Sequence, residues 1–89
     1  MLPIYPRITA VEVRRPYVLK LRFKDDSEGE VDLWPVIQGQ KGLFIPLQDP
    51  EFFGQVRVDP ESGTVVWPNG VDLDPDVLYH KAHRNAETR

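Results

Sequence analysis

The 89-residue sequence predicts an α+β fold: a small single domain, with an antiparallel sheet of two hairpins and short helices on one side. Residues 17–24 alternate apolar with polar side chains, which is the pattern of a half-buried strand. Residues 56–59 and 64–67 are rich in Val and flank a turn-forming string. Two Asp-Pro strings, at residues 49–50 and 74–75, are typical helix starts. Strands and helices in this order favour an α+β class.

The first strands follow a proline-rich start. Residues 1–6 are expected to form an extended lead, because prolines are unsuited to helices and limit ladder hydrogen bonds. Residues 8–14 are rich in Val, Ile and Thr and predict a strand that Pro16 ends. The next strand spans residues 17–24. Its apolar face comprises Tyr17, Leu19, Leu21 and Phe23.

Residues 25–29 are predicted to form a hairpin loop, in which Gly29 supplies a positive φ. Residues 30–33 then return as the partner strand. The expected register sets apolar against apolar on one face and opposite charges against each other on the other face. Its pairs are Phe23–Val31, Leu21–Leu33, Lys24–Glu30 and Arg22–Asp32.

The middle of the chain predicts short elements. Residues 34–37 favour a helical turn, residues 39–42 a loop, and residues 43–47 a short extended piece that Pro46 limits. Asp49 is expected to cap a short helix that Gly54 ends.

The C-terminal part predicts the second hairpin and a last helix. Residues 56–59 and 64–67 pair around residues 60–63. Asp74 is expected to cap a helix that continues to about His83, and residues 85–89 to form a frayed tail. The predicted core consists of Leu19, Leu21, Phe23, Val31, Leu33, Phe44, Phe53, Val56, Val58, Val65 and Trp67.

Composition narrows the function classes. The chain has no cysteine, which removes disulfides, thiolate metal sites and cysteine nucleophiles and fits a reducing compartment. No stretch has the roughly 20 apolar residues that span a bilayer, so a cytoplasmic protein without membrane contact is expected. The net charge of −3 weighs against a general nucleic-acid binder.

A longer pattern resembles a known family. The most specific part is Trp67-Pro-Asn-Gly-Val-Asp-Leu73, followed by Pro75-Asp76 and Leu78-Tyr79. Together with the strand and turn segments before it, over about residues 5–80, this string resembles the bacterial family DUF2442, a domain of unknown function. The weaker segments are residues 17–23 and 29–33, Gly42-Leu-Phe44, Leu47-Gln-Asp-Pro50 with Phe53, and Val56-Arg-Val58.

The resemblance implies a small α+β unit with an antiparallel sheet. Some members of the family carry an added C-terminal helix-turn-helix; because this sequence ends at Arg89, we expect none here. The family is also associated with small partner genes of toxin–antitoxin character. The resemblance supplies no catalytic residues.

Two clusters resemble metal sites. Asp72, Asp74 and Asp76 alternate like the start of a calcium loop, but the Gly and Glu that such a loop needs are missing. His80 and His83 share one helix face, yet they are the only histidines, and zinc requires three or four ligands. We therefore expect no metal site and no cofactor, with helix capping as the role of the aspartates.

Basic residues gather on the first two strands: Arg14, Arg15, Lys20, Arg22 and Lys24. On one sheet face they could contact phosphates. Acidic residues on the opposite strand are expected to neutralise that face, and it carries no aromatic side chains on which bases could stack. Nucleic-acid contact is therefore the weaker alternative.

The best candidate binding site is the loop of residues 67–72 next to Tyr79. It gathers an indole, an amide, a carboxylate and a phenol, from Trp67, Asn69, Asp72 and Tyr79. A small ligand or a partner's backbone could bind there. The alternative is a structural turn, with Trp67 in the core and Asn69 and Gly70 at positive φ.

These observations lead to one preferred function and two alternatives. We expect a non-enzymatic protein-binding or regulatory module, of which a toxin–antitoxin-type operon partner is one form. The strand edge at residues 8–13 is open to a partner's strand or to a second copy. The alternatives are a nucleic-acid-binding regulator using the basic face, and a metal-dependent enzyme using Asp72, Asp76, His80 and His83.

Overall fold

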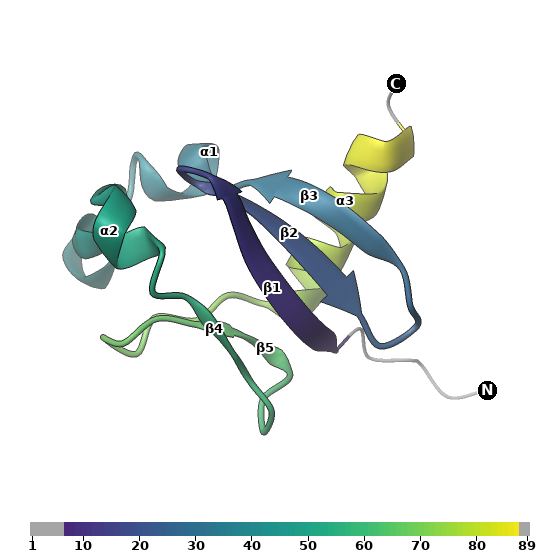
Figure 1. Ribbon diagram of the computed structural model, residues 1–89. Coiled ribbons are helices and arrows are strands. Elements are labelled where there is room, and N and C mark those ends of the chain that lie inside the picture. The colour runs from purple at the N-terminus through teal and green to yellow at the C-terminus, as the bar shows by residue number, and fades with distance from the viewer. Residues whose placement is uncertain (1–6, 88–89) are drawn as a thin grey trace.

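The computed structural model describes residues 7–87, with side chains described as far as His83 (Figure 1). Nine elements follow one another along the chain. They are β1 (Ile8–Arg15), β2 (Val18–Phe23), β3 (Glu28–Asp32), α1 (Trp34–Ile37), the 3₁₀ helix η1 (Gly42–Gln48), α2 (Pro50–Phe53), β4 (Arg57–Asp59), β5 (Thr64–Val66) and α3 (Pro75–Glu87).

The strands form two antiparallel sheets. One has three strands in the order β1-β2-β3, and the other is the hairpin β4-β5. Helix α3 packs against β3 on one face of the larger sheet, and the hairpin β4-β5 lies beside β1 (Figure 1). The predicted α+β class with antiparallel sheets is confirmed. The two predicted hairpins belong to separate sheets, and the first sheet gains β1 as a third strand.

The register of β2 against β3 differs from the predicted one. Leu21 lies opposite Gly29 instead of Leu33, and Arg22 lies opposite Glu28 instead of Asp32. The chain reverses earlier than expected, because the backbone N–H of Phe23 already donates to the Ser27 carbonyl at 2.9 Å. The predicted pairs were therefore wrong, but the faces were right, since a shift by an even number of residues leaves every side chain on its face.

Gly29 has a different role from the one predicted. It lies inside β3, and the positive φ of this turn belongs to Asp26, at 72°. A β-carbon at position 29 would lie 2.8 Å from the Cβ of Ala82 on α3. Glycine is therefore required here by the close approach of helix and strand.

Tyr17 also departs from its expected strand position. It stands in the turn between β1 and β2 with φ at 70°, a conformation that non-glycine residues rarely adopt. Its ring lies 4.7 Å from that of Trp34 and 5.4 Å from that of Phe53, and its hydroxyl donates to the Gln48 carbonyl. Tyr17 thus links α1, η1 and α2, and these contacts offset the strain of its backbone.

Residues 43–47 are helical, so the predicted extended piece was wrong. They belong to η1, a helix with three residues per turn. Phe44 and Leu47 are three apart and turn inward, whereas Leu43 and Ile45 remain exposed. Pro46 is compatible with this helix, because its fixed φ matches the 3₁₀ value.

Both predicted Asp caps are present. The Asp49 carboxylate accepts the backbone N–H of Glu51 at 3.0 Å, and that of Asp74 accepts the N–H of Asp76 at 2.9 Å. Helix α3 continues to Glu87, so residues 85–87 are helical and not a frayed tail. The expected lead at residues 1–6 and the last two residues of the tail lie outside the described residues.

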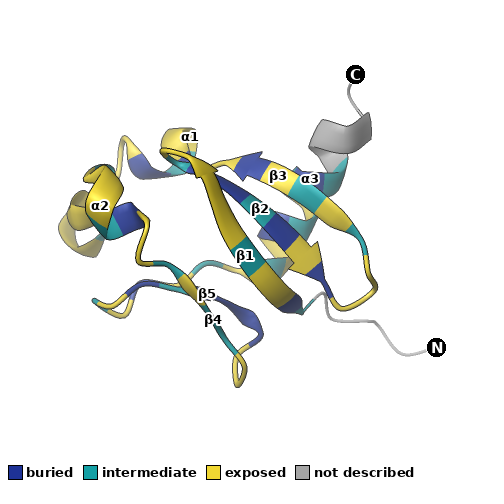
Figure 2. Ribbon diagram, viewed as in Figure 1, coloured by how far each residue is buried: buried dark blue, intermediate teal, exposed yellow. Residues whose placement is uncertain are grey.

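The core lies between the larger sheet, α3 and the β4-β5 hairpin (Figure 2). Eight of the predicted core residues are buried: Leu19, Leu21, Phe23, Val31, Leu33, Phe53, Val65 and Trp67. Phe44, Val56 and Val58 are partly buried and pack against them. The prediction omitted the buried Ile8, Val18, Ile37, Leu47, Val71, Leu78 and Ala82.

Candidate interaction surfaces

The open face of the larger sheet carries the predicted basic residues, and acidic partners lie beside three of them. Arg14 lies 3.3 Å from Glu12 and 3.5 Å from Glu30. Lys20 and Arg22 each lie 3.5 Å from Glu28, and Arg22 is also 3.5 Å from Asp26. The structure therefore brings Arg14, Lys20 and Arg22 together on one face of the sheet, as predicted. Their acidic partners differ from the predicted ones, because the register of β2 against β3 differs.

The two remaining members of the basic set are exposed. Arg15 and Lys24 form no ion pair within residues 7–83. They lie at opposite ends of the sheet, one at the end of β1 and the other just after β2. The face consequently presents mixed charge, and its central cations are already neutralised.

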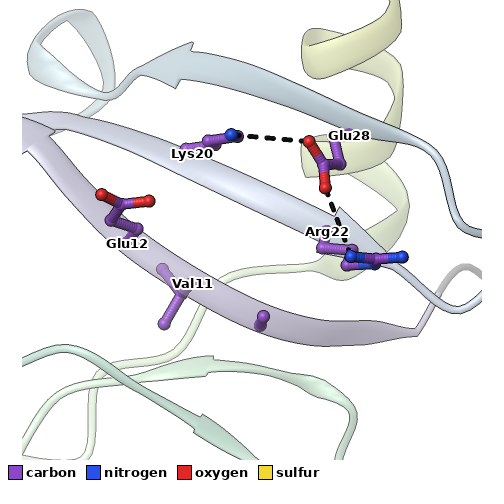
Figure 3. A pocket seen from close by; sticks show the side chains of 6 residues that line it. Val11, Glu12, Lys20, Arg22 and Glu28 are labelled. Carbon is purple, nitrogen blue, oxygen red and sulfur yellow. Dashed lines mark ion pairs between the residues drawn. The ribbon is translucent and has the colours of Figure 1, made fainter.

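A shallow groove of about 250 Å³ crosses this face (Figure 3). In this groove Glu28 of β3 pairs with both Lys20 and Arg22 of the neighbouring strand β2 (Figure 3). Its lining consists of Ala10, Val11, Glu12, Lys20, Arg22 and Glu28. Phosphates approaching this groove would compete with carboxylates for the same cations.

Two side chains of the loop at residues 67–72, those of Trp67 and Asn69, form hydrogen bonds within the protein. Trp67 is buried, and its Nε1–H donates to the Phe53 carbonyl at 2.9 Å. The Asn69 amide donates to the Leu43 carbonyl at 2.9 Å and accepts the Val71 N–H at 3.3 Å. Asp72 is exposed and forms an isolated bridge with Val66. The loop therefore fastens η1 to the second hairpin.

Tyr79, expected beside this loop, contacts the β2–β3 turn instead. Its hydroxyl donates to the Asp25 carboxylate at 2.6 Å, and its ring lies 4.9 Å from that of Phe23. The Ser27 hydroxyl, at 2.5 Å from the same carboxylate, together with Tyr79, lowers the pKa of Asp25 to about 2. The hydrogen bond to Asp25 raises the pKa of Tyr79.

The histidines and aspartates near α3 do not converge. His83 stacks on Tyr79 with ring centroids 3.9 Å apart and makes a 2.8 Å contact from Nδ1 to the Tyr79 carbonyl, while His80 is exposed. Asp74 serves as a helix cap. Within the described part of the chain, no three His, Asp or Glu side chains are grouped as metal ligands.

One exposed apolar surface was not predicted from the sequence. Among the exposed large apolar residues, three lie on α1 and η1, which contact each other: Leu43 is 61% exposed, Ile45 55% and Trp34 37%. We call these three residues the α1–η1 apolar surface. The apolar run Leu43-Phe-Ile-Pro-Leu47 could have predicted this surface. A short helix of three residues per turn buries only one of its faces, so such a run leaves apolar side chains exposed.

Within residues 7–87, none of the helices combines the length and apolar character needed to cross a lipid bilayer.

The molecule is an α+β domain with a charge-paired sheet face and an exposed apolar surface at one end. Residues 8–84 match the family described as "Protein of unknown function (DUF2442)", and the chain belongs to this family. The resemblance drawn from the sequence is thus confirmed.

A solved structure has the same fold. It is the crystal structure of a protein from Nitrosomonas europaea ATCC 19718 named "Putative DNA Binding Protein", 29% identical, with a TM-score of 0.78. The match covers 92% of this chain and 52% of the other, so this chain spans about half the length of that protein. No curated protein matches the chain.

Proposed function

We propose that this protein is a non-enzymatic protein-binding module that engages its partner through the α1–η1 apolar surface. The observation that carries the proposal is the exposure of Leu43, Ile45 and Trp34 on two adjoining short helices. Exposed apolar side chains that gather in one place, unlike scattered ones, mark interaction sites. Trp is also enriched among the residues that dominate binding energy.

The same surface is held rigid from below. The Trp34 ring lies 4.7 Å from the Tyr17 ring, and the Leu43 carbonyl accepts the Asn69 amide at 2.9 Å. Preformed anchors lose little conformational entropy on binding, so more of the contact energy appears as affinity. In this proposal the loop at residues 67–72 supports the binding surface and does not itself bind.

The arrangement of polar groups supports a non-enzymatic role. The Ser27 hydroxyl donates to Asp25, and His83 is directed to the Tyr79 carbonyl. A serine nucleophile needs a base positioned to accept its proton, and a carboxylate whose pKa is about 2 is a weak base. This cluster is suited to fastening α3 to the β2–β3 turn.

The partner that fits best is another protein encoded beside this one, in an operon of toxin–antitoxin character. The apolar surface provides anchors for such a partner, and the exposed Lys41 next to it could contribute to a polar rim.

A nucleic-acid-binding regulator is the second candidate, favoured by the name of the solved relative from Nitrosomonas europaea. On this chain it would use the basic sheet face. The carboxylates 3.3–3.5 Å from Arg14, Lys20 and Arg22 oppose it, because each phosphate contact would have to displace an ion pair.

Affinity capture of the tagged protein from its native host, with half of the extract treated with nuclease, separates the two candidates. A stoichiometric protein that survives nuclease supports the protein-binding module. A catch that disappears with nuclease and weakens steeply with salt supports the second candidate. A catch without any stoichiometric macromolecule contradicts both.

A further inference from the structure

β1 forms an edge of the larger sheet to which another strand could be added. β1 is the outermost strand on its side and the longest strand of the described chain. Among the described residues, a backbone hydrogen bond to this edge is found at its beginning, where the Ile8 N–H donates to the Gly63 carbonyl of the β4–β5 turn at 2.8 Å. Glu12, Val13 and Arg14, further along β1, are exposed.

The hydrogen bonds of β2 show which way the backbone of β1 points. The Leu33 N–H donates to the Tyr17 carbonyl, and the Phe23 N–H donates to the Ser27 carbonyl. Odd-numbered residues of β2 therefore face β3 with their backbone groups, and even-numbered ones face β1. Glu12 lies opposite Lys20, so its backbone groups face β2. The backbone N–H and C=O of the next residue, Val13, therefore point away from β2, toward the open edge of the sheet.

The side chains beside Val13 are self-complementary. Val13 is 37% exposed and stands between Glu12 and Arg14, which carry opposite charges. An antiparallel copy centred on Val13 places each Glu12 opposite Arg14 of the second copy, at the point where the register of β1 against β2 shifts between Val13 and Arg15. The two valines then meet on the same face.

Other symmetric registers are worse. A pairing centred on Glu12 sets the two Glu12 carboxylates against each other, which is destabilising. A pairing centred on Val11 moves the second copy toward Ile8, where the β4–β5 turn already occupies the edge. Charge and space therefore select the same centre.

We propose that this protein forms a two-fold symmetric dimer in which β1 pairs antiparallel with β1 of a second copy, centred on Val13. The two three-stranded sheets become one sheet of six strands. The interface uses main-chain hydrogen bonds from the free edge and two reciprocal Glu12–Arg14 pairs. This dimer goes beyond the proposed function, because the α1–η1 apolar surface of each copy does not take part in the dimer interface.

Sedimentation equilibrium over a concentration series tests the dimer. Wild-type protein is expected to dimerise, and Glu12→Arg to weaken dimerisation roughly tenfold or more, because two attractions become repulsions. The double change Glu12→Arg with Arg14→Glu restores the opposite charges and is expected to recover the dimer. Glu28→Arg, on the far strand, is the matched control and leaves dimerisation unchanged.

Val13→Pro provides an independent check. It is expected to weaken dimerisation, because it removes the N–H that points to the second copy and leaves the hydrogen bonds to β2 intact. Circular dichroism confirms folding of each variant before sedimentation. A wild-type protein that stays monomeric at all concentrations, or a Glu12→Arg variant that dimerises as tightly as wild type, would overturn the proposal.

Discussion

Gly29 of β3 faces Ala82 of α3 so closely that position 29 has no room for a side chain. A β-carbon at position 29 would lie 2.8 Å from the Ala82 Cβ and 2.9 Å from the Ala82 carbonyl oxygen. We predict that Gly29→Ala destabilises the protein by about 1–3 kcal/mol, because either the helix or the strand has to move. Urea denaturation followed by circular dichroism measures the change.

Gly39 provides the control for this prediction. A β-carbon at Gly39 would meet nothing within 4 Å, and its φ is not positive. Gly39→Ala is therefore expected to be neutral or slightly stabilising, by up to about 1 kcal/mol. Equal effects of the two substitutions would show that α3 does not pack on β3 as described.

Tyr17 tests whether packing outweighs backbone strain. With φ at 70°, Tyr17→Gly relieves a strain of roughly 1–2 kcal/mol. The same change removes a ring in contact with Trp34 and Phe53, a loss of about 3–5 kcal/mol for a large aromatic residue. We predict a net destabilisation of about 1–4 kcal/mol for Tyr17→Gly.

Tyr17→Phe separates the ring from the hydroxyl. It removes only the hydrogen bond to the Gln48 carbonyl and should lower the unfolding free energy by about 1 kcal/mol. A Tyr17→Gly variant that is more stable than wild type in urea would contradict the linking role of this residue.

Asp25 predicts a dependence on acid pH. Its carboxylate accepts the hydroxyls of Ser27 and Tyr79, which lower its pKa from 3.8 to about 2. Because the folded pKa lies below the unfolded one, this contribution to stability is complete above about pH 4 and is lost as the pH falls toward 2.

The carboxyl signal of Asp25 in an NMR titration measures this pKa directly. It should titrate near pH 2 in the wild-type protein and at a higher pH in Ser27→Ala, which removes the donor with the largest effect. Tyr79→Phe should raise it as well. An Asp25 midpoint unaffected by either change would disprove the hydrogen-bonded cluster.

The sequence predicted the class of the fold because alternation and capping are local. The apolar face of Leu19, Leu21 and Phe23 and the caps at Asp49 and Asp74 depend only on neighbouring residues. The β2–β3 register was not predictable in the same way. Asp26, a residue other than glycine, takes the positive φ, while Gly29 serves a contact with a helix more than fifty residues later.

The candidate sites depended on such distant contacts. Tyr79 is near the loop of residues 67–72 in the chain, yet it bonds to Asp25, and Asn69 bonds to Leu43. The basic residues could be located because strand alternation fixes their face. The α1–η1 apolar surface was missed because the helical conformation of η1, which exposes Leu43 and Ile45, has no period-two signature.

Variants of the exposed apolar residues test the central claim most directly. Affinity capture from nuclease-treated extract of the native host compares wild-type protein with Leu43→Asp/Ile45→Asp and with Val77→Asp. Val77 is an apolar residue of α3 that is 48% exposed, so it controls for adding charge at an exposed apolar position. The account predicts that wild type and Val77→Asp recover the same stoichiometric protein and that Leu43→Asp/Ile45→Asp loses it. Recovery of that protein by the double variant at wild-type yield would contradict binding through the α1–η1 apolar surface.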